Sequence, residues 1–407
     1  MSPAELEALL KQGIALHKAG KFAEAEAQYR KVLEMAPNVP VALENLGLIL
    51  HKSRQLDEAI RLLRRAVELE PRYPLFYRNL AVVYRTEGKP QEAVVALRKA
   101  VELAPDDGLC WGDLGVSLDL SGFLGDAFAV YEKAIRLLTP LFNAASAGKS
   151  PPSDEVTTEL SRAHYNHGSV LGRWNRLEEA MDDYETSIRI KPDFAESHRN
   201  RSGVLFYRGK FKEAWEEYEW RWKCADYPGQ LPNFPQPMWD GSDLAGRTIL
   251  LWWEQGFGDT IQFCRYAPLI KARGGRIALL CQRETKRLLQ TLEGVDELAF
   301  NGERKVEFDT HVSLMSVPHF MGTTRETIPA FKSYLRADSK DSADWEERLA
   351  SDGPGFRVGL AWAGGAAHHN DRRRSIPFSL LEPLTAHPGI KFYTLQLGTP
   401  AEQLRNS

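Results

Sequence analysis

The sequence has few of the features that mark secreted, membrane-spanning or disulfide-bonded proteins. Four cysteines occur among 407 residues and form no Cys-x-x-Cys motif, so we expect free thiols in a reducing compartment. No apolar run approaches the roughly 18 residues that a membrane-spanning helix needs. The start, MSPAELEALLKQG, has no basic region followed by an apolar stretch, which argues against a secretory signal. These absences predict a cytoplasmic protein without a membrane span.

An excess of basic charge is also missing. The net charge is −3, so we expect no nucleic-acid partner. Two adjacent histidines, His368 and His369, come without a set of carboxylates, and we therefore expect no metal site and no cofactor. A hydrophobic content of 43% and a charged content of 26% suit a multidomain globular protein.

Small residues and prolines recur with a period of 34 from the amino terminus to about residue 228. Prolines lie at Pro37, Pro71 and Pro105. The same frame holds a small residue at two further positions, namely Gly13, Gly47, Ala81, Gly115 and Gly168, and Ala25, Ala59, Ala93, Ala127 and Ala180. The pattern predicts about six repeats over residues 1–228. An insertion near residues 140–157, rich in Pro, Ser and Ala, predicts a surface excursion between two helices.

These positions resemble the tetratricopeptide repeat, in which two antiparallel helices pack through small residues and a proline follows the second helix. The resemblance implies an all-α solenoid with a concave groove, because no single repeat can bury its apolar face alone. A protein or peptide in that groove is the partner that the resemblance implies.

One polar position recurs on the first helix of successive repeats. It is occupied by Asn45, Asn79, Asp113, Asn166 and Asn200. Side chains of this kind can bond to a peptide backbone, and the row resembles the asparagine ladder of the O-linked N-acetylglucosamine transferases. A second interpretation stays open, in which asparagine is common at this position because it bonds between repeats.

The pattern changes after the repeats. Residues 229–247 are a proline-rich linker, and we expect its aromatic residues to pack on the last repeat. Residues 248–340 alternate strands and helices, which predicts a Rossmann-like parallel sheet. Residues 355–407 predict the start of a second Rossmann-like unit with one strand, one helix and one strand.

The segment EQGFGDT and the later GLAWAGG and DRRRSIP resemble bacterial tetratricopeptide proteins that carry a heptosyltransferase-like glycosyltransferase domain of the GT-B fold. The resemblance implies an acceptor loop at Glu254, Gln255, Gly256 and Gly258, with Asp259 as the base that deprotonates the acceptor. A structural interpretation competes with this one, since Asp259 at the N-cap and Gln262 three residues later fit a capping box.

The same resemblance assigns the donor diphosphate to the second loop. The implied residues are Gly364, Gly365, Asn370, Arg372, Arg374 and Ser375. The forked guanidinium groups of arginine match phosphate oxygens. An alternative interpretation is that these residues are a solvated basic run without a ligand. The family carries an Asp-(Ser/Thr)-x-x-x-His segment further on, and none follows Leu397, so we expect this chain to lack part of the donor half.

Two functions follow from these patterns. The first is an inverting glycosyltransferase that moves a sugar from a nucleotide-sugar, its donor substrate, to an acceptor presented by the repeats. The acceptor is a protein or a saccharide, and the missing donor segment makes activity of this chain doubtful. The alternative is a scaffold without enzymatic activity that binds peptides or protein partners.

Overall fold

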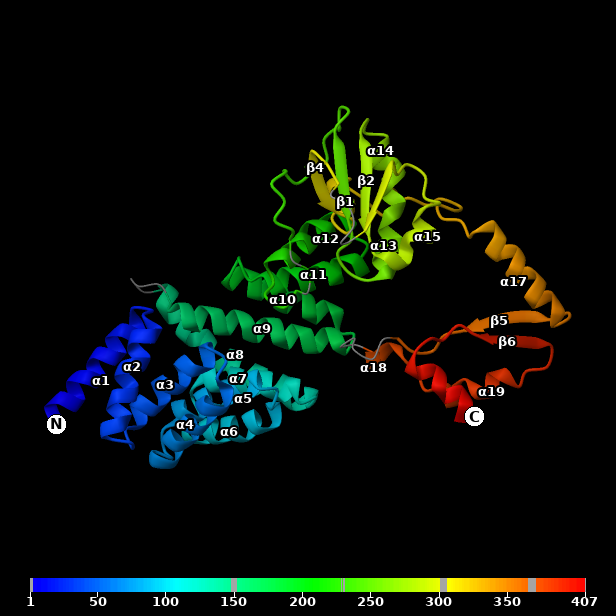
Figure 1. Ribbon diagram of the computed structural model, residues 1–407. Helices are drawn as coiled ribbons and strands as arrows, with labels where there is room; N and C mark the ends of the chain where they lie inside the picture. The colour runs from blue at the N-terminus through cyan, green and yellow to red at the C-terminus, as the bar shows by residue number, and fades with distance from the viewer. Residues whose placement is uncertain are drawn as a thin grey trace.

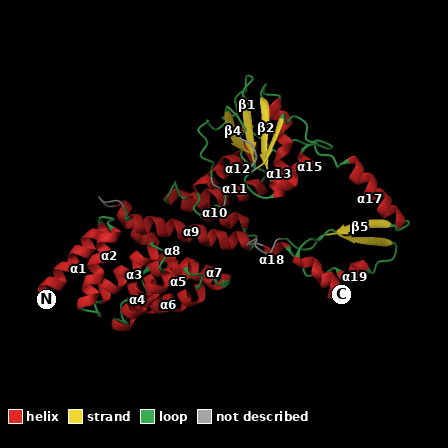
Figure 2. Cartoon of the chain, viewed as in Figure 1, coloured by secondary structure: helices red, strands yellow, loops and turns green. Residues whose placement is uncertain are grey.

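The computed structural model describes residues 3–147, 152–227, 229, 231–300, 306–364 and 371–406. An all-helical array occupies the amino-terminal part, and an α/β region follows it, as the sequence predicts (Figures 1 and 2). All four cysteines are free and buried, which confirms the expectation of free thiols.

The helical array consists of antiparallel helix pairs that stack in chain order. Each helix packs on the one before it and the one after it along the array. The helices are α1 (Pro3–Lys18), α2 (Phe22–Met35), α3 (Pro40–Lys52), α4 (Leu56–Leu69), α5 (Pro74–Thr86), α6 (Pro90–Leu103), α7 (Gly108–Leu120), α8 (Leu124–Ala147), α9 (Asp154–Arg173), α10 (Leu177–Ile190), α11 (Ala195–Tyr207) and α12 (Phe211–Tyr218).

The recurring small residues lie where two helices of a pair touch. A Cβ on Gly47 would lie 2.9 Å from the Leu63 side chain, and one on Gly115 would lie 2.4 Å from the Tyr131 ring. Ala59 is fully buried in the same kind of seam. The period of 34 in the sequence is therefore the spacing of these close helix contacts.

Each turn inside a helix pair uses one residue in the left-handed region. The φ values at this recurring position lie between 61° and 85°. Glycine adopts such a conformation without steric cost, whereas other residues are strained there. The residues are Gly20, Arg54, Gly88, Gly122, Asn175 and Gly209.

The insertion lengthens the two helices that flank it. The helix α8 has 24 residues and continues through Pro140, and α9 has 20 residues and begins after the N-cap Ser153. The sequence predicts a surface excursion here, but most of the inserted residues in the described part of the chain continue the helices instead. Residues 148–151 lie outside the described residues.

The α/β region contains a four-stranded parallel sheet in the order β3-β2-β1-β4. Its strands are β1 (Thr248–Trp252), β2 (Arg276–Cys281), β3 (Glu297–Phe300) and β4 (Thr310–Ser313). Ile249, Leu251, Ile277 and Leu279 are fully buried in its core. The sheet confirms the predicted parallel α/β region, but the structure alone does not establish a GT-B fold.

The helices between these strands are short. The segment after β1 is divided into α13 (Phe257–Phe263), a turn of 3₁₀ helix and α14 (Ala267–Lys271). The next is a 3₁₀ turn followed by α15 (Lys286–Leu289), and α16 (Val317–Phe320) follows β4. The last repeat packs against this region, because Trp215 and Tyr218 of α12 contact its core.

The linker aromatics Phe234 and Trp239 pack on the sheet. Trp239 is 1% exposed within the core of the α/β region. The Phe234 ring contacts Phe308 and His311, and His311 belongs to β4. The expectation that the linker aromatics pack on the last repeat is therefore wrong for these two rings, whereas the Tyr227 ring just before residue 229 does contact Trp222 at the end of the last repeat.

The carboxyl-terminal part is small and exposed. It has two parallel strands, β5 (Phe356–Leu360) and β6 (Ile390–Thr394), with the short helices α18 (Asp371–Arg374) and α19 (Glu382–Thr385). The helix α17 (Ser339–Ser351), which the sequence interpretation missed, precedes them and has no buried residue.

Replacing Gly115 by alanine should destabilise the repeats. The added methyl group would meet the buried Tyr131 ring at 2.4 Å, and overpacking of this kind costs about 1–3 kcal/mol. Chemical denaturation followed by circular dichroism measures the change. Gly125→Ala is the matched control, because no heavy atom lies within 4 Å of its added Cβ and it should leave stability equal or slightly higher. Equal loss in both variants would contradict the assignment of the seam.

Candidate functional sites

The predicted row of amides lies on the first helices of the repeats, and its members differ in their partners. Asn45 Nδ2 donates to Val41 O of its own helix at 2.8 Å. Asn79 Nδ2 donates to Glu44 Oε1 of the preceding repeat at 2.7 Å. Asn166 and Asn200 are half-buried. The hydrogen bond of Asn79 runs between repeats, as the second interpretation of the row predicts. This bond uses one of the two N–H donors of the Asn79 amide.

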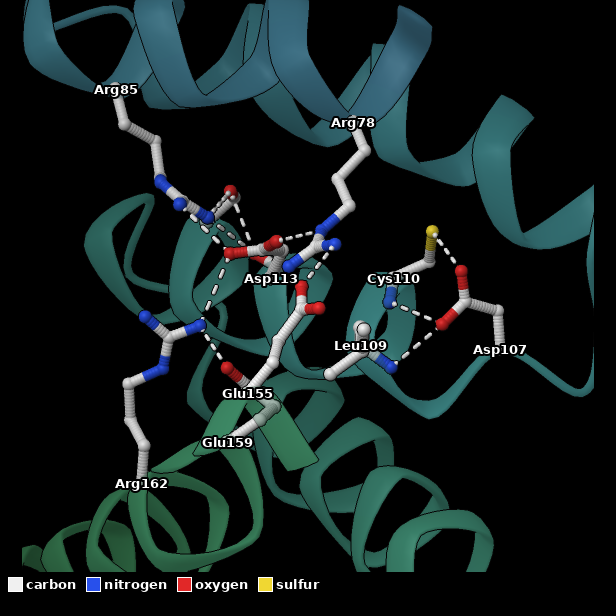
Figure 3. A network of polar contacts seen from close by, with 10 residues as sticks. Arg78, Arg85, Asp107, Leu109, Cys110, Asp113, Glu155, Glu159 and Arg162 are labelled. Atoms are coloured by element: carbon white, nitrogen blue, oxygen red, sulfur yellow. Dashed lines mark hydrogen bonds and ion pairs between the residues drawn. The ribbon is translucent and has the colours of Figure 1, made fainter. Parts of the chain in front are cut away.

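Asp113 differs from the rest of the row because it is 2% exposed. Its carboxylate accepts hydrogen bonds from Arg78 Nε and Arg85 Nη2 at 2.8 Å each, and from Arg162 Nη2 at 3.3 Å. Figure 3 shows the three guanidinium groups converging on it from α5 and α9. Burial would raise the pKa of Asp113, but these arginines outweigh burial and the pKa is lowered.

Two further carboxylates reach this cluster from the start of α9. Glu155 Oε1 accepts from Arg78 Nη1 at 3.1 Å, and Glu159 pairs with Arg162. Glu159 is 4% exposed, and burial raises its pKa to about 7 against the opposing effect of Arg162. Its Oε1 has no hydrogen-bond partner among the described residues. We name Arg78, Arg85, Asp113, Glu155, Glu159 and Arg162 the arginine cluster.

The sequence interpretation missed this cluster. The only signal was that Asp113 replaces asparagine in the row. Its partners lie 28 to 49 residues away along the chain, and Arg78 and Glu155 are separated by 77 residues. No local pattern links residues at such distances.

Glu254, predicted in the acceptor loop, lies at the junction between the repeats and the sheet. It forms a two-pronged ion pair with Arg221, with Nε to Oε1 and Nη2 to Oε2 both at 2.8 Å. Both side chains are completely buried. The rings of Tyr218 and Trp222 lie 4.4 Å and 4.3 Å from the guanidinium carbon.

Other hydroxyl groups complete this junction. Ser313 and Tyr227 donate to the Glu254 carboxylate. Arg221 Nη2 also donates to Ser316 Oγ at 2.6 Å, and Ser316 donates to Glu219 Oε2 at 3.0 Å. Burial would lower the pKa of Arg221, but Glu254 and Glu219 outweigh it and keep the pKa raised. Glu254 thus joins the two parts of the molecule, a role that the sequence did not reveal.

Asp259 lies in the first turn of α13, close to the carboxyl end of β1. Its Oδ2 accepts from the backbone N–H of Gly256 at 3.0 Å, and Gly256 is the N-cap. The predicted capping box with Asp259 as the N-cap is therefore wrong. Asp259 is at the N3 position and supplies only the bond that reaches back to the N-cap N–H, because Gly256 has no side chain to complete a box. Asp259 is half-buried, and its role as a base remains a prediction.

The rest of the predicted acceptor loop is held by hydrogen bonds to neighbouring segments. Gln255 Nε2 contacts the Tyr227 hydroxyl, while Gln282 Nε2 donates to Gln255 O at 3.0 Å. Gly258 faces open space, because nothing lies within 4 Å of a Cβ placed there. The loop is consequently ordered by β2, β4 and the last repeat, with its outer side free.

The predicted donor loop makes its contacts within the carboxyl-terminal part. Gly364 N donates to Ser375 Oγ at 2.9 Å, and Ser375 donates to Asp371 Oδ1 at 2.8 Å. Arg374 lies 3.5 Å from Asp371 and is half exposed. Gly365, Asn370 and the histidine pair lie outside the described residues, as does the side chain of Arg372.

One group of potential metal ligands occurs in the described part of the chain. Glu196, Cys224 and Asp226 offer ligand atoms within 4.8 Å of one another. Asp226 is already paired with Arg199 at 2.8 and 3.0 Å, which competes with a cation. No helix among the described residues is both long and apolar enough to cross a membrane.

Replacing Arg221 by methionine should destabilise the α/β region by ~3–5 kcal/mol, because Glu254 would remain as an unpaired buried charge. Urea unfolding followed by tryptophan fluorescence measures this loss. Arg176→Met, which breaks the exposed pair with Glu179, is the control and should leave the midpoint unchanged. The double variant Arg221→Met/Glu254→Met should recover much of the stability. A wild-type midpoint in the single Arg221 variant would show that the pair does not stabilise the junction.

Comparison with known proteins supports the repeat assignment. Models of the tetratricopeptide repeat match residues 10–74, 45–108 and 78–141, and a further one matches residues 161–194. Protein FlbA of Caulobacter vibrioides is 27% identical over 270 residues, which cover 61% of this chain and 45% of FlbA. The chain thus spans less than half the length of that curated relative.

Solved structures match about half of this chain. YrrB, described as a tetratricopeptide protein with an unusual peptide-binding site, is 20% identical with a TM-score of 0.38, covering 47% of this chain and 90% of YrrB. The pilF protein of Pseudomonas aeruginosa is 18% identical with a TM-score of 0.42, covering 52% of this chain and 88% of pilF. Together with the helix pairs, the family matches show that the amino-terminal part of this chain is a tetratricopeptide-repeat solenoid, which a small parallel-sheet α/β region follows.

Proposed function

We propose that this protein is a protein-interaction scaffold whose repeats bind an extended peptide. The observation that supports it is the row of half-buried amides on the first helices of the second, third, fifth and sixth repeats, at Asn45, Asn79, Asn166 and Asn200. First helices line the groove in proteins of this repeat type, so the row follows the direction of a bound chain.

An amide side chain suits this task because it both donates and accepts. Asn45 and Asn79 each use one N–H within the protein, which leaves the amide with further capacity for a ligand. Bonds to a peptide backbone give affinity without demanding a particular sequence. The row therefore fits an extended chain better than a folded surface.

The double variant Asn45→Ala/Asn166→Ala should weaken peptide binding. A random twelve-residue peptide library displayed on phage is selected on the wild-type protein, and the selected peptides are titrated by fluorescence anisotropy. Loss of two hydrogen bonds of about 1 kcal/mol each predicts an affinity lower by at least about tenfold. Asn38→Ala, in a turn where Asn38 accepts from Arg65, is the control. Failure to select any peptide, or equal affinity in the double variant, would overturn the proposal.

A second candidate is sugar transfer by the α/β region. The half-buried carboxylate of Asp259 close to the carboxyl end of the parallel strand β1 favours it, because Rossmann-type sheets bind ligands at that edge. In this proposal Asp259 removes the acceptor proton, and Arg372 and Arg374 hold the diphosphate of a nucleotide-sugar. An inverting displacement needs the acceptor hydroxyl in line with the bond from the sugar to the leaving diphosphate.

Asp259→Asn tests this candidate. Asparagine keeps an oxygen that accepts from the Gly256 N–H but lacks the carboxylate that would remove the acceptor proton. Nucleotide release from UDP-, GDP- and CMP-linked sugars is measured in both proteins with a peptide acceptor chosen as above. We expect turnover in the wild type and a loss of at least about a hundredfold in the variant. Asp243→Asn, an exposed carboxylate in the linker, should keep full activity. Unchanged release in the Asp259 variant rules out the assigned base, and no release by the wild type rules out the transferase.

A further inference from the structure

The first helix of the fifth repeat is longer at its start than its counterparts. The helices α3, α5, α7 and α11 have 13 residues each, whereas α9 has 20. The additional residues, Asp154–Leu160, precede Ser161, where the repeat frame begins. We name them the α9 extension. They are part of the insertion, and neither the repeat pattern nor the family matches account for them.

The α9 extension lies against the first helices of the two preceding repeats. Glu155 reaches Arg78 on α5, two repeats back. Glu159 is pressed against α7, where a Cβ on Gly112 would lie 2.0 Å from its Oε1. A larger residue at position 112 would force this carboxylate to move. The extension therefore occupies the groove side of the third and fourth repeats.

This placement explains why Asp113 is inaccessible. The neighbouring members of the row, Asn79 and Asn166, are half-buried, but Asp113 is 2% exposed among the arginines and glutamates of the arginine cluster (Figure 3). A peptide that followed the row would meet the extension at this point. The middle of the groove is already filled by two acidic side chains of the protein itself.

The contacts of the α9 extension with the arginine cluster are incomplete. Glu155 is 61% exposed at its ion pair with Arg78, and exposed pairs contribute little stability. Glu159 is buried with its Oε1 unpaired, and Arg162 Nε is also buried without a partner among the described residues. Ionised Glu159 works against its own burial, since its pKa is raised to about 7. A ligand that satisfies these groups better can replace the two carboxylates.

We propose that the α9 extension is an internal substitute for an acidic peptide, and that the partner displaces it to bind Arg78, Arg85 and Arg162. The inference rests on the proposed scaffold function and names the chemical class of its partner. The spacing supports an extended peptide. Four helical residues separate Glu155 from Glu159 by about 6 Å, and alternate residues of an extended chain are about 6.6 Å apart. Acidic residues at alternate positions fit the same guanidinium groups.

A charge-neutral variant of the extension tests the proposal. Fluorescein-labelled (Glu-Ser)₄ is the probe, and (Gln-Ser)₄ is the uncharged reference of equal length. In Glu155→Gln/Glu159→Gln the affinity for (Glu-Ser)₄ should rise by about tenfold or more, because the competing carboxylates no longer hold the arginines. The affinity for (Gln-Ser)₄ should not change. The matched control is Glu178→Gln/Glu179→Gln, which neutralises two carboxylates at the start of α10 and should alter neither affinity.

Hydrogen exchange in the wild-type protein supplies an independent measurement. Saturating (Glu-Ser)₄ should speed exchange in residues 154–160 and leave residues 161–173 protected. Equal affinity in the wild type and the extension variant, or an equal gain for (Gln-Ser)₄, overturns the proposal. Absence of (Glu-Ser)₄ binding to both proteins overturns it too. The scaffold function stands or falls separately, by whether the library peptides bind and depend on Asn45 and Asn166.

Discussion

The buried ion pair between Arg221 and Glu254 fixes how the two parts of the molecule are joined. Arg221 comes from the end of the last repeat, and Glu254 follows β1 at the edge of the sheet where Rossmann-type folds bind ligands. Such a pair is costly to bury and is tolerated only with complete hydrogen bonding, which Ser313, Ser316 and Tyr227 provide. The loop that carries Asp259 is therefore positioned by the repeats as well as by the sheet.

The arginine cluster also contains buried charges that need complete hydrogen bonding, but not all of its charged groups obtain it. At the junction every charged group has a partner of opposite charge. In the cluster, Asp113 is fully satisfied by three arginines, whereas Glu159 keeps an unpaired oxygen. Low dielectric strengthens a satisfied network and penalises an incomplete one. The complete bonding at the junction therefore stabilises the fold, whereas the incomplete bonding of Glu159 allows the arginine cluster to exchange this carboxylate for a ligand.

Local chemistry explains what the sequence predicted well. Gly47, Gly115 and Ala59 recur because a larger side chain would collide with the facing helix, so their spacing revealed the helix pairs. The strand β2 lies in the region where the sequence predicts alternating strands and helices, because its central residues are apolar. The contacts of Arg221 with Glu254, and of Arg78 with Glu155, were not predictable because only the folded chain brings these residues together. The helix α17 escaped notice because it buries nothing and so shows no apolar face.

The length of the α9 extension has a geometric consequence. Two turns of an α-helix contain about 7.2 residues, so seven added residues return to nearly the same angular position. Glu155, Glu159, Arg162 and Asn166 therefore fall on one stripe of α9 that continues the amide row. One residue added or removed between Glu159 and Arg162 would rotate both glutamates by about 100° relative to the repeat and direct them elsewhere. The phase of the helix, and not only its charge, places the two glutamates on the arginines.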